Sequence, residues 1–392
     1  MTMTEPTYSL DEIRLRVSQI DNQLLELLAQ RRQLSLEVAK SKISTAKPVR
    51  DKAREHDLLL KLIETGKEKQ LDPQYVTQLF HTIIEDSVLY QQAFLQQLIN
   101  PENAQPSARI AFLGSKGSYS HLASLNYFSR KQTQLLEMSC SSFRDVINEV
   151  ELGHADYGVL PIENTSSGSI NEVYDLLQHT SLSIVGEITQ PIEHCLLTAV
   201  ETQLEAIDTL YSHPQPHQQC SEFVHQLGEI KQEYCSSTAD AMKIVAELSQ
   251  SNIAAIGNAT SGEMYGLYSL TEHIANQEQN FTRFIVVARK AIDVTPLIPA
   301  KTTFIMSTGQ SAGSLVECLL ILKNHNINMA KLESRPVMGN PWEEMFYVDV
   351  EENIKSEVMK QAMEELSQVT RFIKVLGCYA TENVKPTEVT ID

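Results

Sequence analysis

The sequence predicts three domains in one chain: an all-helical domain, a two-lobed α/β domain and a small α+β domain. Three observations lead to this prediction. Apolar residues in the first segment recur at alternating spacings of three and four, strand-like and helix-like runs alternate in the second, and a βαββαβ pattern fills the third. Polar stretches that contain proline separate the segments, so we set the boundaries at 1–100, 108–290 and 301–380.

Composition limits the classes of function. The chain has 392 residues, 42% of them hydrophobic, and a formal net charge of -18. That charge disfavours nucleic-acid or membrane-surface partners, which need a basic face. No run approaches the ~18 apolar residues of a membrane span, and the N-terminus has no apolar signal core. The six cysteines are scattered without a CxxC pair, so we expect reduced thiols in the cytoplasm and no disulfide or zinc framework.

The first segment is predicted to form a helical bundle. Ser9 and Glu12 fit a capping box, and the apolar heptad pattern that follows predicts a helix from Leu10 to about Ile43, roughly 50 Å long. Pro48 ends this helix, and Asp72-Pro73 starts a second long one. A helix of that length needs partners along its whole length, which favours a bundle intertwined between two chains.

Charged residues share faces of these helices. Arg31 interrupts the apolar stripe, and Lys42, eleven residues later, returns to within about 20° of the same face. Arg14 points about 100° away from Arg31, so we expect it to reach the same site from a second chain. Further helix faces carry Asp51, Arg54 and Glu55, and Ser87 and Gln91. Such charges fit a solvated surface or a polar site, and the charge at an apolar position favours the site.

The first domain resembles the all-helical chorismate mutase class in the segments LLELLAQRRQLSLEVAKSK, AKPVRDKAREHDLL and IIEDSVLYQQ. A mutase has to hold the chorismate dianion compactly during a pericyclic shift and to stabilise charge on the breaking ether oxygen. Arginine forks suit the carboxylates, Lys42 and Gln91 suit the ether oxygen, and Glu55 and Asp51 suit the hydroxyl or the cations. The resemblance implies a site of Arg14 from a partner chain, Arg31, Lys42, Asp51, Arg54, Glu55, Ser87 and Gln91.

The second segment places polar turns at the ends of predicted strands. Each turn alone fits ordinary N-capping of a following helix. Together they favour a single ligand cleft, because open α/β sheets bind ligands beyond the carboxyl ends of their strands. The turns are Gly114–His121, Pro161–Ser169, Tyr211–Cys220, Gly257–Gly262 and Asn280–Phe284.

The motifs GSKGSYSH, PIENTSSGSINEVYDLL and NFTRF in these turns resemble prephenate dehydratase. The resemblance implies an essential Thr282, with Glu163, Asn164 and Gln215 lining the cleft. Expulsion of the ring hydroxyl needs a proton donor while carbon dioxide leaves. We interpret Thr282 as a hydrogen bonder or relay, and Glu163 as the acid if burial raises its pKa. The HPQPH stretch at 213–217 fits a loop and helix start better than a pair of catalytic histidines.

The third segment has a ferredoxin-like order, with two strands bracketing a turn at Gly339-Asn340-Pro341. GSLVECLL and LESRPVMGNPWEEMFYVDV resemble the ACT regulatory domain of phenylalanine-inhibited dehydratases, with Ser314 replacing the usual alanine. The resemblance implies that phenylalanine binds between two chains. The implied regulatory residues are Gly313, Leu315, Glu333, Ser334, Arg335 and Pro336.

The whole chain therefore resembles the bifunctional chorismate mutase/prephenate dehydratase family. This implies a homodimer or higher homo-oligomer that acts on chorismate and prephenate, responds to phenylalanine and needs no metal or cofactor. A mutase joined to prephenate dehydrogenase is disfavoured, because FLGSKGSYSH lacks the GxGxxG spacing of a nicotinamide site. A non-catalytic solute-binding sensor is the other alternative, since two-lobed clefts also serve that role. Production of phenylpyruvate from added chorismate distinguishes the three.

Overall fold

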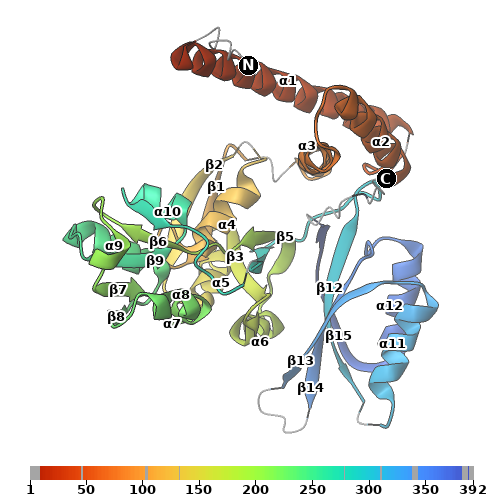
Figure 1. Ribbon diagram of the computed structural model, residues 1–392. Helices are drawn as coiled ribbons and strands as arrows, with labels where there is room; N and C mark the ends of the chain where they lie inside the picture. Colours follow the sequence, from red (N-terminus) through yellow and green to blue (C-terminus); the bar gives the residue numbers. More distant parts are fainter. Residues whose placement is uncertain are drawn as a thin grey trace. The chain divides into compact units, whose positions relative to one another are not determined.

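The structure is a computed structural model (Figure 1), and it describes residues 9–45, 47–101, 105–131, 133–277, 279–309, 311–337, 343–381 and 387. The chain divides into two compact units. One comprises Met1–Ile99 and Val384–Asp392, and the other comprises Asn100–Asn383. The turn predicted at Gly339-Asn340-Pro341 lies outside the described residues.

The first unit is built on three helices: α1 (Leu10–Thr45), α2 (Lys52–Glu68) and α3 (Pro73–Ile99). The predicted capping box begins α1, because Glu12 N donates to Ser9 Oγ at 3.3 Å and Ser9 N donates to the Glu12 carboxylate at 2.8 Å. The long first helix and the start of the last helix at Pro73 are both confirmed. Both α1 and α2 pack against α3.

The apolar stripe of α1 is exposed within a single chain. Ser35 and Ala39 are the buried residues of this helix, whereas Leu24, in the middle of the heptad pattern, is 53% exposed. Isolated exposed leucines are ordinary, but a contiguous apolar row on one helix marks an interaction surface. The row consists of Leu10, Ile13, Val17, Ile20, Leu24, Leu27, Leu28 and Leu34.

The second unit contains a first α/β lobe on a mixed sheet with strand order β2-β1-β3-β11-β5, and β4 pairs with β3. β1, β2 and β3 run parallel, and β11 is antiparallel to both of its neighbours. The elements are β1 (Ser107–Leu113), α4 (Tyr119–Phe128), β2 (Gln134–Cys140), α5 (Phe143–Glu151), β3 (Tyr157–Asn164), β4 (Gly168–Ser169), α6 (Asn171–His179), β5 (Ser183–Pro191) and β11 (Phe281–Ala288).

Side chains of β11 alternate between the two faces of this sheet. Ile285 and Val287 join the apolar cluster under α5 and α6, whereas Phe284 and Val286 join the cluster under α4. Both faces of the strand are therefore covered, as its nearly continuous apolar sequence predicts.

The second lobe has a five-stranded sheet with order β10-β6-β9-β7-β8. The chain enters this lobe after β5 and returns to the first sheet as β11, so the two lobes are joined by two crossings. The elements are β6 (Cys195–Thr198), η2 (Leu204–Ala206), β7 (Thr209–Ser212), α7 (Pro214–Gln219), α8 (Ser221–Gln226), β8 (Lys231–Tyr234), α9 (Thr238–Leu248), β9 (Ile253–Gly257), α10 (Ala259–Met264) and β10 (Tyr268–Thr271).

The C-terminal part of the second unit has the predicted βαββαβ order. Its antiparallel sheet is ordered β13-β14-β12-β15, and α11 and α12 lie together against one face (Figure 1). The elements are β12 (Ala300–Thr308), α11 (Ser314–Asn324), β13 (Met329–Pro336), β14 (Glu344–Val350), α12 (Glu357–Val369) and β15 (Thr370–Ala380).

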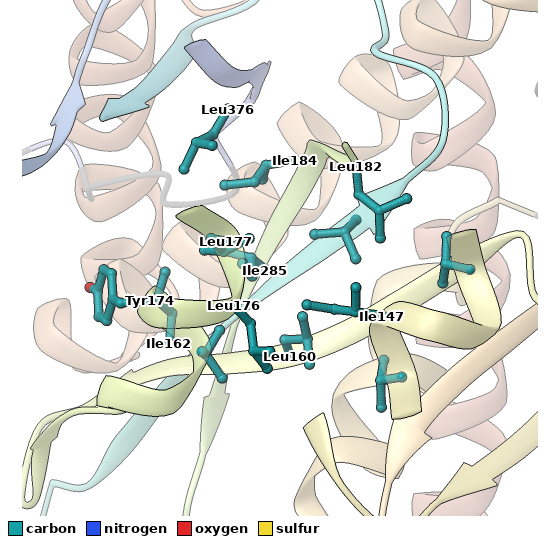
Figure 2. Close-up of a cluster of buried hydrophobic side chains, with 14 of the residues drawn as sticks. Ile147, Leu160, Ile162, Tyr174, Leu176, Leu177, Leu182, Ile184, Ile285 and Leu376 are labelled. Carbon is teal, nitrogen blue, oxygen red and sulfur yellow. The ribbon is translucent and has the colours of Figure 1, made fainter. Parts of the chain in front are cut away.

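One apolar cluster joins this C-terminal sheet to the first lobe. Figure 2 shows Leu376 of β15 beside Ile184 of β5, next to Leu177 and Ile285 of the first lobe. Tyr347 of β14 belongs to the same cluster. Because protein interiors are closely packed, a displacement of the C-terminal sheet also displaces β5 and the side chains packed against it.

Candidate active sites

The helical unit encloses a pocket of about 240 Å³ between its three helices. All seven residues that the sequence assigned to this site within one chain line the pocket. Those residues are Arg31, Lys42, Asp51, Arg54, Glu55, Ser87 and Gln91. The remaining wall is largely apolar and comes from Leu34, Ser35, Val38, Val49, Leu58, Ile84 and Val88.

Cations dominate the polar side of this pocket. Arg31 Nη1 donates to the carbonyl of Ile83 at 3.2 Å and to Ser87 Oγ, and Lys42 Nζ donates to the carbonyl of Val49. Burial lowers the pKa of Arg31. The pKa of Lys42 is lowered first by burial and then by repulsion from Arg54. Such mutual repulsion is relieved when a dianion enters, so the pocket is preorganised for a doubly negative ligand.

Gln91 has an unused polar atom inside this pocket. The residue is 6% exposed, and its side-chain Oε1 has no hydrogen-bond partner among the described residues. Buried polar side-chain atoms nearly always have a partner in native structures. The unpartnered Oε1 of Gln91 therefore indicates a missing hydrogen-bond donor.

The acidic residues of the site are held by neighbours. Asp51 is the N-cap of α2, where its carboxylate accepts from Arg54 N at 3.0 Å; it therefore starts the helix rather than extending its face. Glu55 accepts from Arg50 Nε at 3.1 Å and from Thr387 Oγ1 at 2.6 Å. Sequence analysis missed Arg50 and Thr387, and Thr387 lies too far along the chain for any local pattern to reveal it.

Arg14 does not reach the pocket of its own chain. Its side chain is 71% exposed and lies 3.7 Å from Asp11 on the first turns of α1. That Arg14 serves a site on another chain stays a prediction.

The dehydratase motifs meet where β3 ends and β11 begins. Asn164 pairs with Thr282 in the antiparallel register. Asn164 Nδ2 donates to Thr282 Oγ1 at 2.9 Å, to Asn280 Oδ1 at 2.7 Å and to the carbonyl of Phe281 at 3.0 Å. Thr282 is 8% exposed. Since its oxygen already accepts from Asn164, its hydroxyl proton remains free for an acceptor on a ligand.

Asn164 also orders the turn that follows β3. Its Oδ1 accepts from the backbone N–H groups of Ser166 and Ser167, both at 2.9 Å. Ser167 Oγ in turn accepts from Gln215 Nε2 at 3.1 Å, which brings the second lobe into contact with this turn. Three of the four predicted dehydratase residues, Asn164, Thr282 and Gln215, are therefore joined in one hydrogen-bonded chain.

The other polar turns have mainly structural roles in the described residues. Ser118 caps α4 by accepting from His121 N at 3.3 Å, and Asn258 caps α10. The hydroxyl of Tyr265 donates to the carbonyl of Lys116, joining the end of α10 to the first turn across the two lobes at 2.5 Å. Each turn alone is thus explained by capping, and the contacts between turns bring them together.

Glu163 and His213, which the sequence analysis considered as proton donors, both have partners in the structure. The Glu163 carboxylate lies 2.6 Å from Lys331 Nζ and 4.0 Å from Arg283 Nη1. His213 is the N-cap of α7, where Nδ1 accepts from Gln215 N at 3.3 Å. Burial lowers the pKa values of both His213 and His217.

The residues expected to bind phenylalanine lie at two places in the C-terminal domain. Gly313 is the N-cap of α11 with a φ of 89°, a conformation that favours glycine, and open space surrounds the position of a Cβ atom. On β13, Glu333 accepts from Ser169 Oγ at 2.6 Å, and Arg335 forms a bidentate pair with Asp175 at 2.8 and 3.0 Å. Leu315 follows on α11, and Ser334 and Pro336 lie on β13.

The described residues include neither a cluster of metal-ligating side chains nor a helix that could cross a membrane. Its residues contain no group of three or more His, Cys, Asp or Glu side chains placed to hold a metal ion. None of its helices combines the length and the apolar character needed to cross a membrane.

Comparisons with known proteins place two families on this chain. Residues 13–92 match the family chorismate mutase type II, and residues 110–292 match the family prephenate dehydratase. The bifunctional chorismate mutase/prephenate dehydratase of Escherichia coli strain K12 is 56% identical over 390 residues, covering 100% of both chains.

Solved structures match most of the chain. The prephenate dehydratase of Arthrobacter aurescens in complex with L-Phe is 25% identical, with a TM-score of 0.63 over 72% of this chain and 93% of that one. GqqA, a quorum-quenching acylase, is 29% identical, with a TM-score of 0.63 over 70% of this chain and 98% of that one. The fold alone therefore does not assign an activity. The match to the curated relative spans both domains, and the chain belongs to the family of bifunctional chorismate mutase/prephenate dehydratases.

Proposed function

We propose that the pocket of the helical unit is the mutase site and that its cations carry the reaction. Arg31 and Arg54 bind the two carboxylates of chorismate, and Lys42 and the Gln91 amide hydrogen-bond the ether oxygen as its bond breaks. Glu55 and Asp51 order these cations or take the substrate hydroxyl. The observation that carries this proposal is a pocket of about 240 Å³ that is lined by three cations and by Gln91. The amide N–H groups of Gln91 are the ones that can donate to the ether oxygen, because its unpartnered Oε1 can only accept. No proton transfer is needed, so fixed charge and orientation suffice.

Replacement of Lys42 tests the ether-oxygen role. Lys42→Met removes the ammonium and keeps the aliphatic stem, and we expect mutase kcat to fall by about 10²- to 10³-fold, the usual effect of losing one preorganised donor. Lys40→Met is the matched control, because Lys40 lies on the same helix, is half-exposed and contacts only Glu37 among the partners shown for it, at 2.7 Å. Near-normal turnover of chorismate by Lys42→Met would contradict the assignment.

For the dehydratase we propose that Thr282 donates its hydroxyl proton in a hydrogen bond to the departing ring hydroxyl. Asn164 supports this role because it donates to Thr282 Oγ1 and so fixes which way the Thr282 hydroxyl points. Gln215 and Asn164 line the same cleft. The bond between the ring and its carboxylate breaks to release carbon dioxide, and its electron pair completes the aromatic ring as the C–O bond breaks. The departing oxygen takes one proton, which a water molecule supplies through the Thr282 hydroxyl, and leaves as water.

Glu163 is the weaker choice for the proton donor. Both of its carboxylate oxygens already face cations, Oε2 towards Lys331 Nζ at 2.6 Å and Oε1 towards Arg283 Nη1 at 4.0 Å. We propose instead that Glu163 helps to hold Asn164, its neighbour on β3, in position.

We propose that the C-terminal domain is an ACT domain that binds phenylalanine and lowers dehydratase activity. The open Gly313 turn can present backbone groups to the polar end of an amino acid, and a relative of this fold is bound to L-Phe. Leu315 and the stretch from Glu333 to Pro336 complete the site, with two chains contributing. Feedback of this kind requires that phenylalanine bind one global state better than another.

We propose that the chain works as a homodimer or a higher homo-oligomer. The exposed apolar row of α1 supports this, because a 36-residue helix with two buried residues needs further burial. A second copy packed along that row also explains how Arg14 joins a mutase site. We place the enzyme in the cytoplasm, since all six cysteines are free thiols. We keep the domain boundaries at 1–100, 108–290 and 301–380.

A further inference from the structure

The neighbouring strands β3 and β11 present side chains to both faces of the sheet in the first lobe. In the antiparallel pair β3–β11, Asn164 is opposite Thr282, and Glu163 is opposite Arg283. Consecutive residues of a strand point to opposite faces of the sheet. The Asn164–Thr282 pair therefore faces the dehydratase turns, and the Glu163–Arg283 pair faces the other way, where the contacts are made with the C-terminal domain.

Arg283 lies at the centre of a buried polar cluster. Its Nε donates to Glu187 of β5 at 2.8 Å, its Nη1 to Asp349 of β14 at 2.6 Å, and its Nη2 to the Tyr379 hydroxyl of β15 at 3.0 Å. Lys301 of β12 contacts both oxygens of Glu187 at 2.8 Å. Two cations and two carboxylates balance each other here. A buried set of this kind is stable only while every member keeps its partners, so the position of each side chain fixes the next.

Further hydrogen bonds and a close backbone contact hold the C-terminal side of this cluster in place. Thr303 Oγ1 donates to Asp349 at 2.6 Å and lies 2.8 Å from the Tyr379 hydroxyl. β15 also lies directly against β5, because a Cβ atom at Gly377 would come within 2.1 Å of the carbonyl oxygen of Ile184. A shift of the C-terminal sheet is therefore transmitted to Arg283 rather than absorbed at the contact.

A second contact reaches Glu163 from β13. Lys331 Nζ lies 2.6 Å from the Glu163 carboxylate and 3.4 Å from Glu333. Glu333 is part of the phenylalanine site proposed above. The chain Glu333–Lys331–Glu163 thus ends one residue from Asn164, as the Arg283 cluster ends one residue from Thr282.

We propose that Arg283 and Glu163 are positioning residues that couple the C-terminal domain to the Asn164–Thr282 pair. Arg283 acts through Tyr379 and its carboxylate partners, and Glu163 acts through Lys331. The proposal rests on the proposed regulation by phenylalanine and names its route. Movement of the C-terminal sheet rotates β3 and β11 at these two residues and changes the hydrogen bond that orients the Thr282 hydroxyl.

The test uses the full-length chain and two substitutions with matched controls. Tyr379→Phe removes only a hydroxyl from the Arg283 cluster, and Lys331→Met removes only the ammonium beside Glu163. Tyr347→Phe and Lys374→Met make the same chemical changes at other contacts between the same domains. Their groups donate to backbone carbonyls in α6 and at its C-cap, and not to β3 or β11.

Dehydratase activity is measured for each variant without phenylalanine and at phenylalanine concentrations that calorimetry shows to be saturating for that variant. We expect the fraction of activity that survives at saturation to rise by at least about 5-fold in Tyr379→Phe and Lys331→Met, the lower end of usual allosteric couplings. Lys331→Arg, which keeps the cation, should restore inhibition, and both control variants should be inhibited like the wild type.

The outcomes separate this proposal from the one on which it rests. Normal inhibition of both Tyr379→Phe and Lys331→Met, with phenylalanine bound, would overturn the coupling route alone. Equal loss of inhibition in the Tyr347→Phe and Lys374→Met controls would also overturn it, because the effect would then belong to the whole domain contact. Absence of phenylalanine binding to the wild type would instead overturn the proposed regulation itself, and the coupling with it.

Discussion

Thr282→Val tests the proposed catalytic role of the Thr282 hydroxyl with little effect on the fold. Valine keeps the branched shape of threonine and removes only Oγ1, which accepts from Asn164 Nδ2 at 2.9 Å. That amide nitrogen has two hydrogens, and it keeps two other acceptors, Asn280 Oδ1 at 2.7 Å and the carbonyl of Phe281 at 3.0 Å. No buried donor is left without a partner. We therefore expect a stability loss of at most about 1 kcal/mol, the net contribution of one ordinary hydrogen bond.

The expected catalytic effect of the same change is much larger. A positioned proton donor or hydrogen-bond donor contributes about 10²- to 10⁴-fold to a rate, which corresponds to roughly 3 to 5 kcal/mol of the barrier. Dehydratase kcat should fall by that factor in Thr282→Val, while mutase activity, which belongs to the other unit, stays at the wild-type level. Thr282→Ser keeps the hydroxyl and should recover much of the rate.

Phenylpyruvate absorbance in base measures the dehydratase step from prephenate, and disappearance of chorismate measures the mutase step in the same preparation. Retention of more than about a tenth of dehydratase kcat in Thr282→Val would refute the role of this hydroxyl, since the loss would then be no larger than one ordinary hydrogen bond explains. A parallel fall in both activities would show that the substitution disturbs folding, and Thr282→Ser would then decide the role.

Three further predictions concern the other parts of the chain. Burial and then repulsion from Arg54 lower the pKa of Lys42 below its ordinary 10.5, so mutase kcat/KM should fall as the pH rises through that lowered value. The Lys42→Arg variant should lose this fall, and a pH–rate profile of that variant with the same alkaline limb would contradict the assignment to Lys42. Leu24→Asp on the exposed row of α1 should shift the chain towards monomer and raise the mutase KM, as light scattering and kinetics would show, and an unchanged mass would reject α1 as the interface. Replacement of Glu333 and Ser334 by alanine should abolish phenylalanine binding in calorimetry, and unchanged affinity would reject that part of the regulatory site.

Local sequence signals predicted the helical unit well. The capping box at Ser9, the heptad spacing along α1 and the Asp-Pro start of α3 act over a few residues, and each appears in the structure where its pattern placed it. Of the seven pocket residues that the sequence predicted, six project from helices, where spacing alone fixes the shared face. Asp51 differs, because an N-cap precedes its helix, and the i, i+3 spacing of a cap resembles that of a helix face.

The contacts that support the dehydratase residues lie beyond such signals. The hydrogen bond between Asn164 and Thr282 joins residues 118 positions apart, and it depends on β11 returning from the second lobe to lie beside β3. The pattern of apolar residues in β11 indicates a buried strand but not its neighbours. The same limit applies to Arg283, whose partners come from β5, β14 and β15, and to Thr387 on Glu55.

Cations line the mutase pocket, whereas neutral groups surround Thr282, and the two reactions explain this difference in charge. The mutase keeps both carboxylates of its substrate, so the cations of Arg31, Lys42 and Arg54 can bind them without opposing the reaction. The dehydratase has to release one carboxylate as carbon dioxide, and a strong cation beside it would stabilise the ground state more than the transition state. In the described part of the chain, Thr282 accordingly lies among neutral amides and hydroxyls. The adjacent Arg283 points to the opposite face, where Glu187 and Asp349 neutralise it. The strand that carries the proposed catalytic hydroxyl thus directs its own cation away from that hydroxyl and towards the C-terminal domain.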